Sequence, residues 1–133
     1  NPFRNEVLMA GGNHNRRTVA RLRQDGTIER LKDFPTDLGV QSDKLTIDPK
    51  TGKYLIYAGN KNEPKQLYEF DSDTNEYLAV EEFVNGWPFS RYNMPVCAFI
   101  AEYNVTMWAD SNGTFLYKHA PRRQPTAGPG HAP

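Results

Sequence analysis

The chain has 133 residues, and its 16 Lys and Arg balance 16 Asp and Glu, so the formal net charge is zero. This balance argues against a nucleic-acid-binding protein that works through overall basicity. A single cysteine excludes an intrachain disulfide framework. The apolar runs are far shorter than the roughly 20 residues that a membrane-spanning helix needs. The length predicts one domain that is large enough to bury a core.

Short apolar or alternating runs bounded by turn residues predict β-strands throughout, and helical periodicity is nearly absent. In chain order the expected strands are Glu6–Ala10, Thr18–Leu22, Ile28–Leu31, Lys44–Ile47, Tyr54–Ala58, Gln66–Phe70, Tyr77–Val80, Val96–Ala101, Thr106–Ala109 and Thr114–Lys118. Tight turns are expected at Asp25-Gly26 and between Asp48 and Gly52, because Gly accepts positive φ and Pro presets φ for a turn. Strands at this spacing predict an all-β sandwich, a barrel or propeller blades.

Three segments of the sequence resemble one another, and each combines an apolar strand with small residues at its end. The segments are Val7–Asn13, Leu55–Asn60 and Thr106–Asn112. They align on Ala10, Ala58 and Ala109, which are 48 and 51 residues apart. A further strand follows each segment, and another precedes the second and the third. The repeating unit is therefore four strands in about 50 residues, the period of the kelch type of β-propeller.

On this period and on Gly11-Gly12 at a strand end, the chain resembles kelch-like β-propeller repeats of the galactose-oxidase type. The second segment has Gly59-Asn60 instead of a glycine pair, and no Trp occupies the usual kelch position. The resemblance implies four-stranded antiparallel blades within a domain of residues 1–119. Residues 5–34 would be a partial blade, 40–84 a full blade and 92–118 a second partial blade.

About two and a half blades are fewer than the four to eight of a closed propeller. The chain is therefore expected to need further blades of a longer protein or copies of itself, and a small β-sandwich is the alternative fold. Residues 120–133 contain four Pro and two Gly. They have little to bury, so we expect a flexible tail.

We expect a non-catalytic binding module that recognises a protein or a carbohydrate through the loops between strands and between blades. The loop after the first strand supplies the donors His14, Arg16 and Arg17. The connector before the eighth strand supplies Trp87, Arg91 and Tyr92, residue types that often anchor interfaces; packing of Trp87 against a neighbouring blade is the alternative. Two other functions remain open: a fragment of a propeller enzyme, such as a carbohydrate oxidase or lyase, and a self-assembling structural fragment.

Two further patterns suggest modification or metal binding. Asp71, Asp73, Asn75 and Glu82 match positions 1, 3, 5 and 12 of a calcium-binding loop. A β-turn whose side chains bond their own backbone is the simpler interpretation, and no other cofactor is expected. Asn104 and Asn112 begin two N-x-S/T sequons, which would be glycosylated in a secreted protein. The compartment stays open, with an extracellular location favoured.

The charges and the cysteine carry two more expectations. Residues 1–32 hold seven Lys and Arg against three acids, whereas residues 69–82 hold six acids and no Lys or Arg. This asymmetry predicts two oppositely charged faces for self-assembly or partner choice, or else a solvated surface. Cys97 has apolar neighbours on both sides, which predicts a buried and inert thiol.

Overall fold

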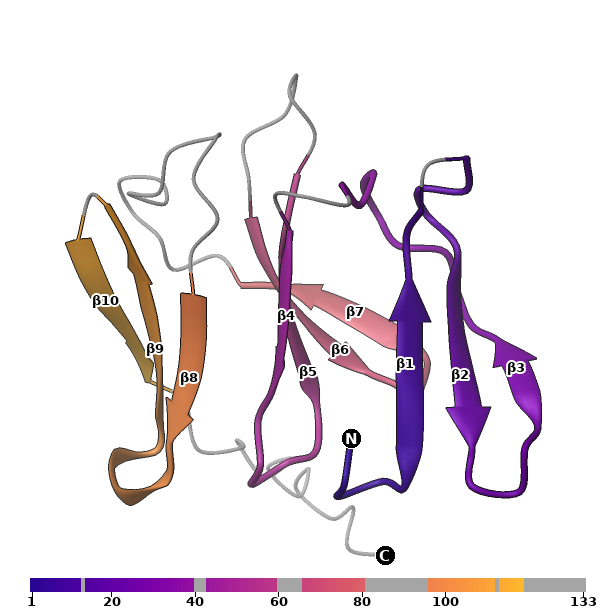
Figure 1. The fold of residues 1–133 in the computed structure, drawn as a ribbon, viewed down its shortest axis with the longest axis horizontal. Helices are drawn as coiled ribbons and strands as arrows, with labels where there is room; N and C mark the ends of the chain where they lie inside the picture. Colours follow the sequence, from indigo (N-terminus) through magenta and orange to yellow (C-terminus); the bar gives the residue numbers. More distant parts are fainter. Residues whose placement is uncertain (13, 40–42, 60–65, 81–95, 112, 119–133) are drawn as a thin grey trace, which may run out of the picture.

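The computed structural model describes residues 1–12, 14–39, 43–59, 66–80, 96–111 and 113–118, and it is all-β (Figure 1). The strands form three antiparallel sheets. In this described part, the only helical element is the short 3-10 turn η1 (Ala101–Tyr103). No helix among these residues has the length and apolar character to cross a membrane. The predicted all-β class is confirmed.

Each sheet is a meander in which strands consecutive in sequence pair with each other. The N-terminal sheet contains β1 (Glu6–Ala10), β2 (Val19–Arg23) and β3 (Ile28–Arg30). The central sheet contains β4 (Lys44–Ile47), β5 (Tyr54–Ala58), β6 (Gln66–Asp71) and β7 (Glu76–Ala79). The C-terminal sheet contains β8 (Val96–Ile100), β9 (Val105–Asp110) and β10 (Gly113–Lys118). Every strand begins and ends within one residue of its predicted bounds.

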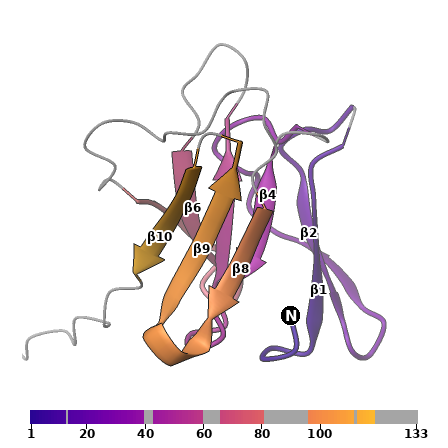
Figure 2. The same cartoon turned by 60° about the vertical axis from the view of Figure 1, so that its left-hand side comes forward.

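The central sheet lies between the other two, as Figures 1 and 2 show. Its strand β5 is buried along all five residues. A strand covered on both faces needs apolar side chains at every position, which explains the run Tyr-Leu-Ile-Tyr-Ala. The described residues cover the outer sheets on one face only, so β2 and β10 alternate between buried or half-buried and more exposed residues.

Two apolar clusters hold the sheets together. The N-terminal core lies between the N-terminal and central sheets and consists of Val19, Leu31, Phe34, Leu38, Tyr54, Ile56, Ala58 and Phe70. The C-terminal core lies between the central and C-terminal sheets and consists of Leu55, Tyr57, Leu67 and Trp108. Burying one large apolar side chain contributes roughly 1.5–3 kcal/mol, so each cluster binds its outer sheet firmly to the centre.

The segment between β3 and β4 seals the N-terminal core. Its Phe34 is 1% exposed. The Phe34 ring meets the rings of Tyr68 and Tyr77 edge to face, at centroid distances of 4.9 and 5.1 Å. Edge-to-face pairs of this kind add to the burial energy. Leu31 and Leu38 are also buried, so this segment is part of the core.

The faces of the strands shift the alignment of the repeats by one residue. Ala58 points into the N-terminal core, towards the preceding sheet. Ala109 shares its face with Val96 and points away from the preceding sheet. Units that repeat in space must present equivalent residues in the same direction. The equivalence of the three alanines is therefore wrong, and Ala10 and Ala109 correspond to Tyr57.

The backbone supports the shifted alignment independently. Glu6, Lys53 and Val105 become equivalent, and the residue before each of them has a positive φ. These residues are Asn5, Gly52 and Asn104, with φ values of 50°, 68° and 54°. Asn and Gly are the residues that adopt this left-handed conformation most readily. The shift also places Gly11-Gly12 opposite Ala58-Gly59.

The sheets correspond to the predicted units in strand number, since the first lacks a leading strand and the third lacks a closing strand. β4 is the first strand of the central sheet and β8 is the first strand of the C-terminal sheet, and these two strands are in contact. The described strands form no closed ring or barrel. The fold is therefore three adjacent antiparallel sheets with two apolar layers between them.

Candidate functional site

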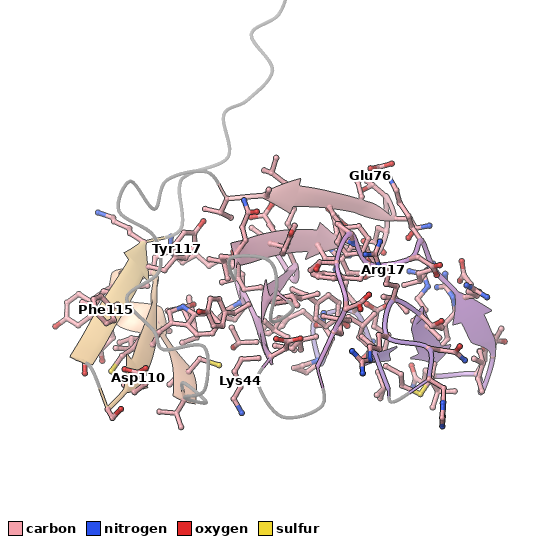
Figure 3. The ribbon with its side chains drawn as sticks, turned by 90° about the horizontal axis from the view of Figure 1, so that it is seen from above. Arg17, Lys44, Glu76, Asp110, Phe115 and Tyr117 are labelled. Atoms are coloured by element: carbon pink, nitrogen blue, oxygen red, sulfur yellow. The ribbon has the colours of Figure 1, made fainter. Side chains whose placement is uncertain are left out.

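A polar hollow opens at the end of the N-terminal sheet where the loop after β1 lies. Arg17, which lines this hollow, is labelled in Figure 3. Its volume is about 350 Å³. The residues that line it are His14, Asn15, Arg16, Arg17, Thr18, Arg30, Asp33 and Asp37. They come from the loop after β1, from the end of β3 and from the segment that follows β3. Two stretches of chain separated in sequence thus form one concave surface.

Backbone hydrogen bonds fix the wall of the hollow to the core. The amide of Phe34 donates to the carbonyl of Arg17 at 2.8 Å, and the amide of Leu38 donates to the carbonyl of Arg16 at 2.9 Å. Both donors belong to buried residues of the N-terminal core. The arginine side chains therefore project from a backbone that the core holds in place, as a preorganised binding site requires.

The hollow carries a surplus of positive charge. Arg17 Nε donates to Asp37 Oδ1 at 3.0 Å, and the guanidinium of Arg16 lies 4.0 Å from the same carboxylate. Arg30 donates to Asp33 at 2.9 Å. Three arginines against two aspartates leave one net positive charge on these five side chains. Because the arginine side chains are at least half exposed, their donors can reach a ligand.

The structure brings together half of the predicted ligand-binding residues. His14, Arg16 and Arg17 all line the hollow. Trp87, Arg91 and Tyr92 lie outside the described residues. Sequence reasoning missed Arg30, Asp33 and Asp37. The sequence shows only that these residues carry charges of both signs near the end of a strand. This pattern does not reveal that they face a loop more than ten residues earlier in the chain.

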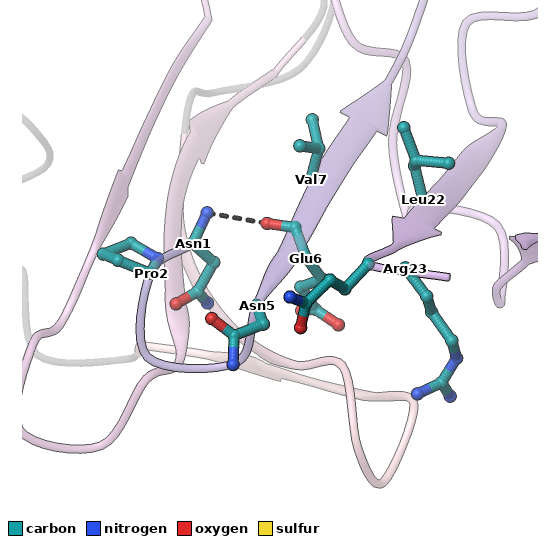
Figure 4. A pocket seen from close by; sticks show the side chains of 8 residues that line it. Asn1, Pro2, Asn5, Glu6, Val7, Leu22 and Arg23 are labelled. Carbon is teal, nitrogen blue, oxygen red and sulfur yellow. Dashed lines mark hydrogen bonds between the residues drawn. The ribbon is translucent and has the colours of Figure 1, made fainter. Parts of the chain in front are cut away.

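A second hollow of about 450 Å³ lies at the opposite end of the N-terminal sheet (Figure 4). Its lining residues are Asn1, Pro2, Asn5, Glu6, Val7, Leu22, Arg23 and Gln24. The amino group of Asn1 donates to the carbonyl of Glu6 at 2.7 Å, and the Asn1 side chain donates to Gly52. The Glu6 carboxylate is 3% exposed. The charge of Glu6 is therefore largely shielded from solvent in this hollow.

The calcium-loop residues are engaged by arginines and by backbone amides, including a bond from the amide of Asp73 to the carboxylate of Asp71. Arg4 donates to Asp71 at 2.8 Å and lies 3.2 Å from Asp73. Asn75 accepts a hydrogen bond from the amide of Lys32. Burial alone would raise the pKa of Asp71, but the hydrogen bond and charge of Arg4 hold it below its usual value.

These contacts do not favour the calcium hypothesis, because a carboxylate paired with a cation is a poor metal ligand. Among the described residues, no group of three or more His, Cys, Asp or Glu could hold a metal ion. Glu82 lies outside them.

The basic and acidic segments of the chain form ion pairs with each other. Arg4 and Arg21 from the basic segment pair with Asp71 and Asp73 from the acidic segment, and Lys32 pairs with Glu76. Much of the opposite charge therefore joins the N-terminal sheet to the central sheet. The prediction that the two segments form opposite faces for partners is wrong for these residues.

Two remaining candidates occupy structural positions. Asn104 caps η1 with a left-handed backbone and is half-buried, whereas Asn112 lies outside the described residues. Glycosylation stays a prediction. Cys97 is half-buried against the C-terminal core. Burial raises the pKa of its thiol, which agrees with the predicted inert cysteine.

Comparison with family descriptions, curated proteins and solved structures finds no match to this chain.

Proposed function

We propose that the chain is a non-catalytic binding module of the β-propeller type, whose polar hollow recognises an acidic group on a protein or a carbohydrate. The observation that carries this proposal is the hollow formed by His14, Arg16, Arg17 and Arg30. A volume of about 350 Å³ suits a sugar ring or an extended side chain. Half-exposed arginines offer the forked donors that bind carboxylate or sulfate groups.

The same residues favour binding over catalysis. Each aspartate of the hollow is engaged by an arginine, Asp37 by Arg17 and Asp33 by Arg30. A carboxylate that already accepts a hydrogen bond from an arginine is less available to accept a proton from a substrate. We therefore keep the oxidase or lyase alternative as the less supported function.

The test is a binding screen of acidic and neutral glycans and of acidic peptides, with the Arg17→Ala variant beside the wild type. Arg17 provides a charge-assisted hydrogen bond, so its loss should weaken binding about tenfold to a hundredfold. Binding should also weaken as salt concentration rises.

Arg23→Ala is the matched control. Arg23 is 47% exposed, Arg17 is 50% exposed, and both pair with a carboxylate. Arg23 lies at the other end of the sheet, so its loss should leave binding unchanged. A preference for neutral ligands, or equal binding by wild type and Arg17→Ala, would refute the proposal.

A further inference from the structure

The two ends of the stack of sheets expose apolar faces. The N-terminal end face is the side of the N-terminal sheet that points away from the central sheet: Val7, Met9, Ala20, Leu22 and Ile28, with Arg30 beside Ala20. The C-terminal end face is the corresponding side of the C-terminal sheet: Val96, Ala98, Met107, Ala109 and Leu116. Ile28, Val96 and Leu116 are each about two-thirds exposed.

These faces correspond to the buried faces of the central sheet. Val7 pairs with Leu22, and Leu22 pairs with Ile28. In the central sheet, the same ladder is Tyr54, Phe70 and Tyr77. That ladder packs against the N-terminal core. The N-terminal end face is therefore the side with which a sheet of this protein packs on the sheet before it.

The C-terminal end face is the complementary side. With the shifted alignment, Met107 occupies the place of Leu55, and Leu55 packs in the C-terminal core against the next sheet. One end of the chain thus presents a front face and the other a back face. A front face placed on a back face repeats a contact that the molecule already makes twice internally.

From this correspondence we propose that two copies of the chain associate head to tail. The C-terminal end face of each copy covers the N-terminal end face of the other. The second hollow provides a recess beside Val7 and Leu22 (Figure 4), into which side chains of the facing sheet fit. Residues 119–133 are a poorer cover, because this segment contains no large apolar residue.

The size of the faces favours a closed pair over an open filament. A face of three five-residue strands measures about 14 by 16 Å, well below the roughly 800 Å² per partner of a standard interface. A closed dimer makes two such contacts at once. It contains twice three sheets, and six lies within the four to eight blades of closed propellers. This ring count rests on the propeller organisation of the proposed function, whereas the head-to-tail contact does not.

Light scattering coupled to size exclusion, at a chain concentration of about 100 μM, tests the association, which depends on concentration by mass action. We expect a particle of about 30 kDa, twice the 15.2 kDa of the chain. Ile28→Asp and Leu116→Asp should each give a 15.2 kDa monomer, because each buries a charge in both contacts. Leu78→Asp is the control, since Leu78 is 63% exposed but lies on neither end face; it should remain a dimer.

A mixture of the two end-face variants identifies the geometry. Ile28→Asp keeps an intact C-terminal end face, and Leu116→Asp keeps an intact N-terminal end face. Their mixture restores one unaltered contact of the two, so the mean mass of the mixture should rise above the mean mass of either variant alone. Circular dichroism of each variant checks that the sheets are retained.

Three results would overturn the proposal. The first is a monomeric wild type, which would leave the end faces to other blades of a longer chain. The second is a dimer abolished by one variant but unaffected by the other, which would indicate that identical faces meet. The third is a mixture whose mean mass equals that of the separate variants. None of these results bears on the ligand screen, which tests the polar hollow separately.

Discussion

The carboxylate of Glu6 links the N-terminal sheet to the central sheet through a buried network. Its Oε1 accepts hydrogen bonds from the Tyr54 hydroxyl at 2.9 Å and from Ser72 Oγ at 2.5 Å. The guanidinium of Arg21 lies 3.5 Å from Oε2 and also donates to the carbonyl of Ser72. Glu6 and Arg21 are both only 6% exposed. Buried charges persist in folded proteins when each is paired and hydrogen-bonded.

Replacing Glu6 by Gln should destabilise the protein by about 2–4 kcal/mol. The substitution preserves shape but leaves the charge of Arg21 buried without its carboxylate on that side, and breaking a buried pair is costly. Urea unfolding followed by circular dichroism measures the change.

Glu29→Gln is the control for this prediction. Glu29 accepts from Arg21 at 2.9 Å but is 43% exposed. Exposed ion pairs contribute about 0–1 kcal/mol. Equal losses for Glu6→Gln and Glu29→Gln would mean that burial does not determine the strength of this network.

Two buried tyrosines make the fold sensitive to alkali. Burial raises the pKa of Tyr57 to about 12. Burial also raises the pKa of Tyr54, and its hydrogen bond to Glu6 raises that pKa further. The folded protein therefore keeps these protons at a pH where the unfolded chain releases them. The free energy of unfolding should fall as pH rises above about 10, by roughly 1.4 kcal/mol per pH unit for each residue.

Urea midpoints between about pH 8 and 12 measure this slope. Tyr57→Phe should reduce the slope by the contribution of one tyrosine. An identical slope in the wild type and in Tyr57→Phe would show that Tyr57 ionises equally in both states.

At the scale of single elements, the turn after β1 needs glycine for two separate reasons. Gly11 has φ +78°, and a Cβ built there would lie 2.9 Å from the Cβ of Leu38. Leu38 belongs to the N-terminal core and cannot move freely. Gly26 has φ +85°, but a Cβ there meets nothing within 4 Å. The two glycines therefore share a positive φ, which would strain an L-residue, and differ in what a Cβ would contact.

Gly26→Ala should cost about 1–2 kcal/mol, the price of a left-handed backbone for an L-residue. Gly11→Ala should cost about 1–3 kcal/mol more, because the added methyl overpacks the core. Thermal unfolding of both variants measures the difference. Equal losses of stability in the two variants would indicate that Leu38 moves away from the added methyl at no cost in free energy.

The positions of the strands were predictable because clear turn residues mark where the strands begin and end. Asp25-Gly26 produces the turn between β2 and β3, and the stretch from Asp48 to Gly52 produces the turn between β4 and β5. The direction in which each strand faces was not predictable in the same way. Ala10, Ala58 and Ala109 share a local pattern, and only packing between sheets shows that Ala58 faces the opposite way.

At the scale of the whole molecule, the candidate site was predictable only in part. His14, Arg16 and Arg17 stand close together in sequence, so their loop could be singled out. The opposite wall is brought there by the buried Phe34 and Leu38, whose amides bond the loop backbone. This pairing is non-local, and a single sequence carries no signal for it. The same holds for the pairing of basic and acidic segments across the two sheets.

The arrangement of three sheets predicts an order of local stability. The central strand β5 has bonded neighbours on both edges and a covered face on each side. Among the described strands, β3 and β10 each have one neighbour and lie at the edges of outer sheets. Local opening requires less free energy where fewer buried contacts are lost. Amide exchange should therefore be slowest in β5 and fastest in β3 and β10.

Two core variants show whether each outer sheet is held separately. Trp108→Ala removes the largest side chain of the C-terminal core, and Phe34→Ala removes a central side chain of the N-terminal core. Truncation of a buried aromatic costs about 3–5 kcal/mol. Amide exchange followed by mass spectrometry should show that Trp108→Ala accelerates exchange mainly in β8, β9 and β10. Phe34→Ala should do so mainly in β1, β2 and β3. Equal acceleration throughout both variants would mean that the three sheets open only as one unit, and the N-terminal and C-terminal cores would then not act as separate layers.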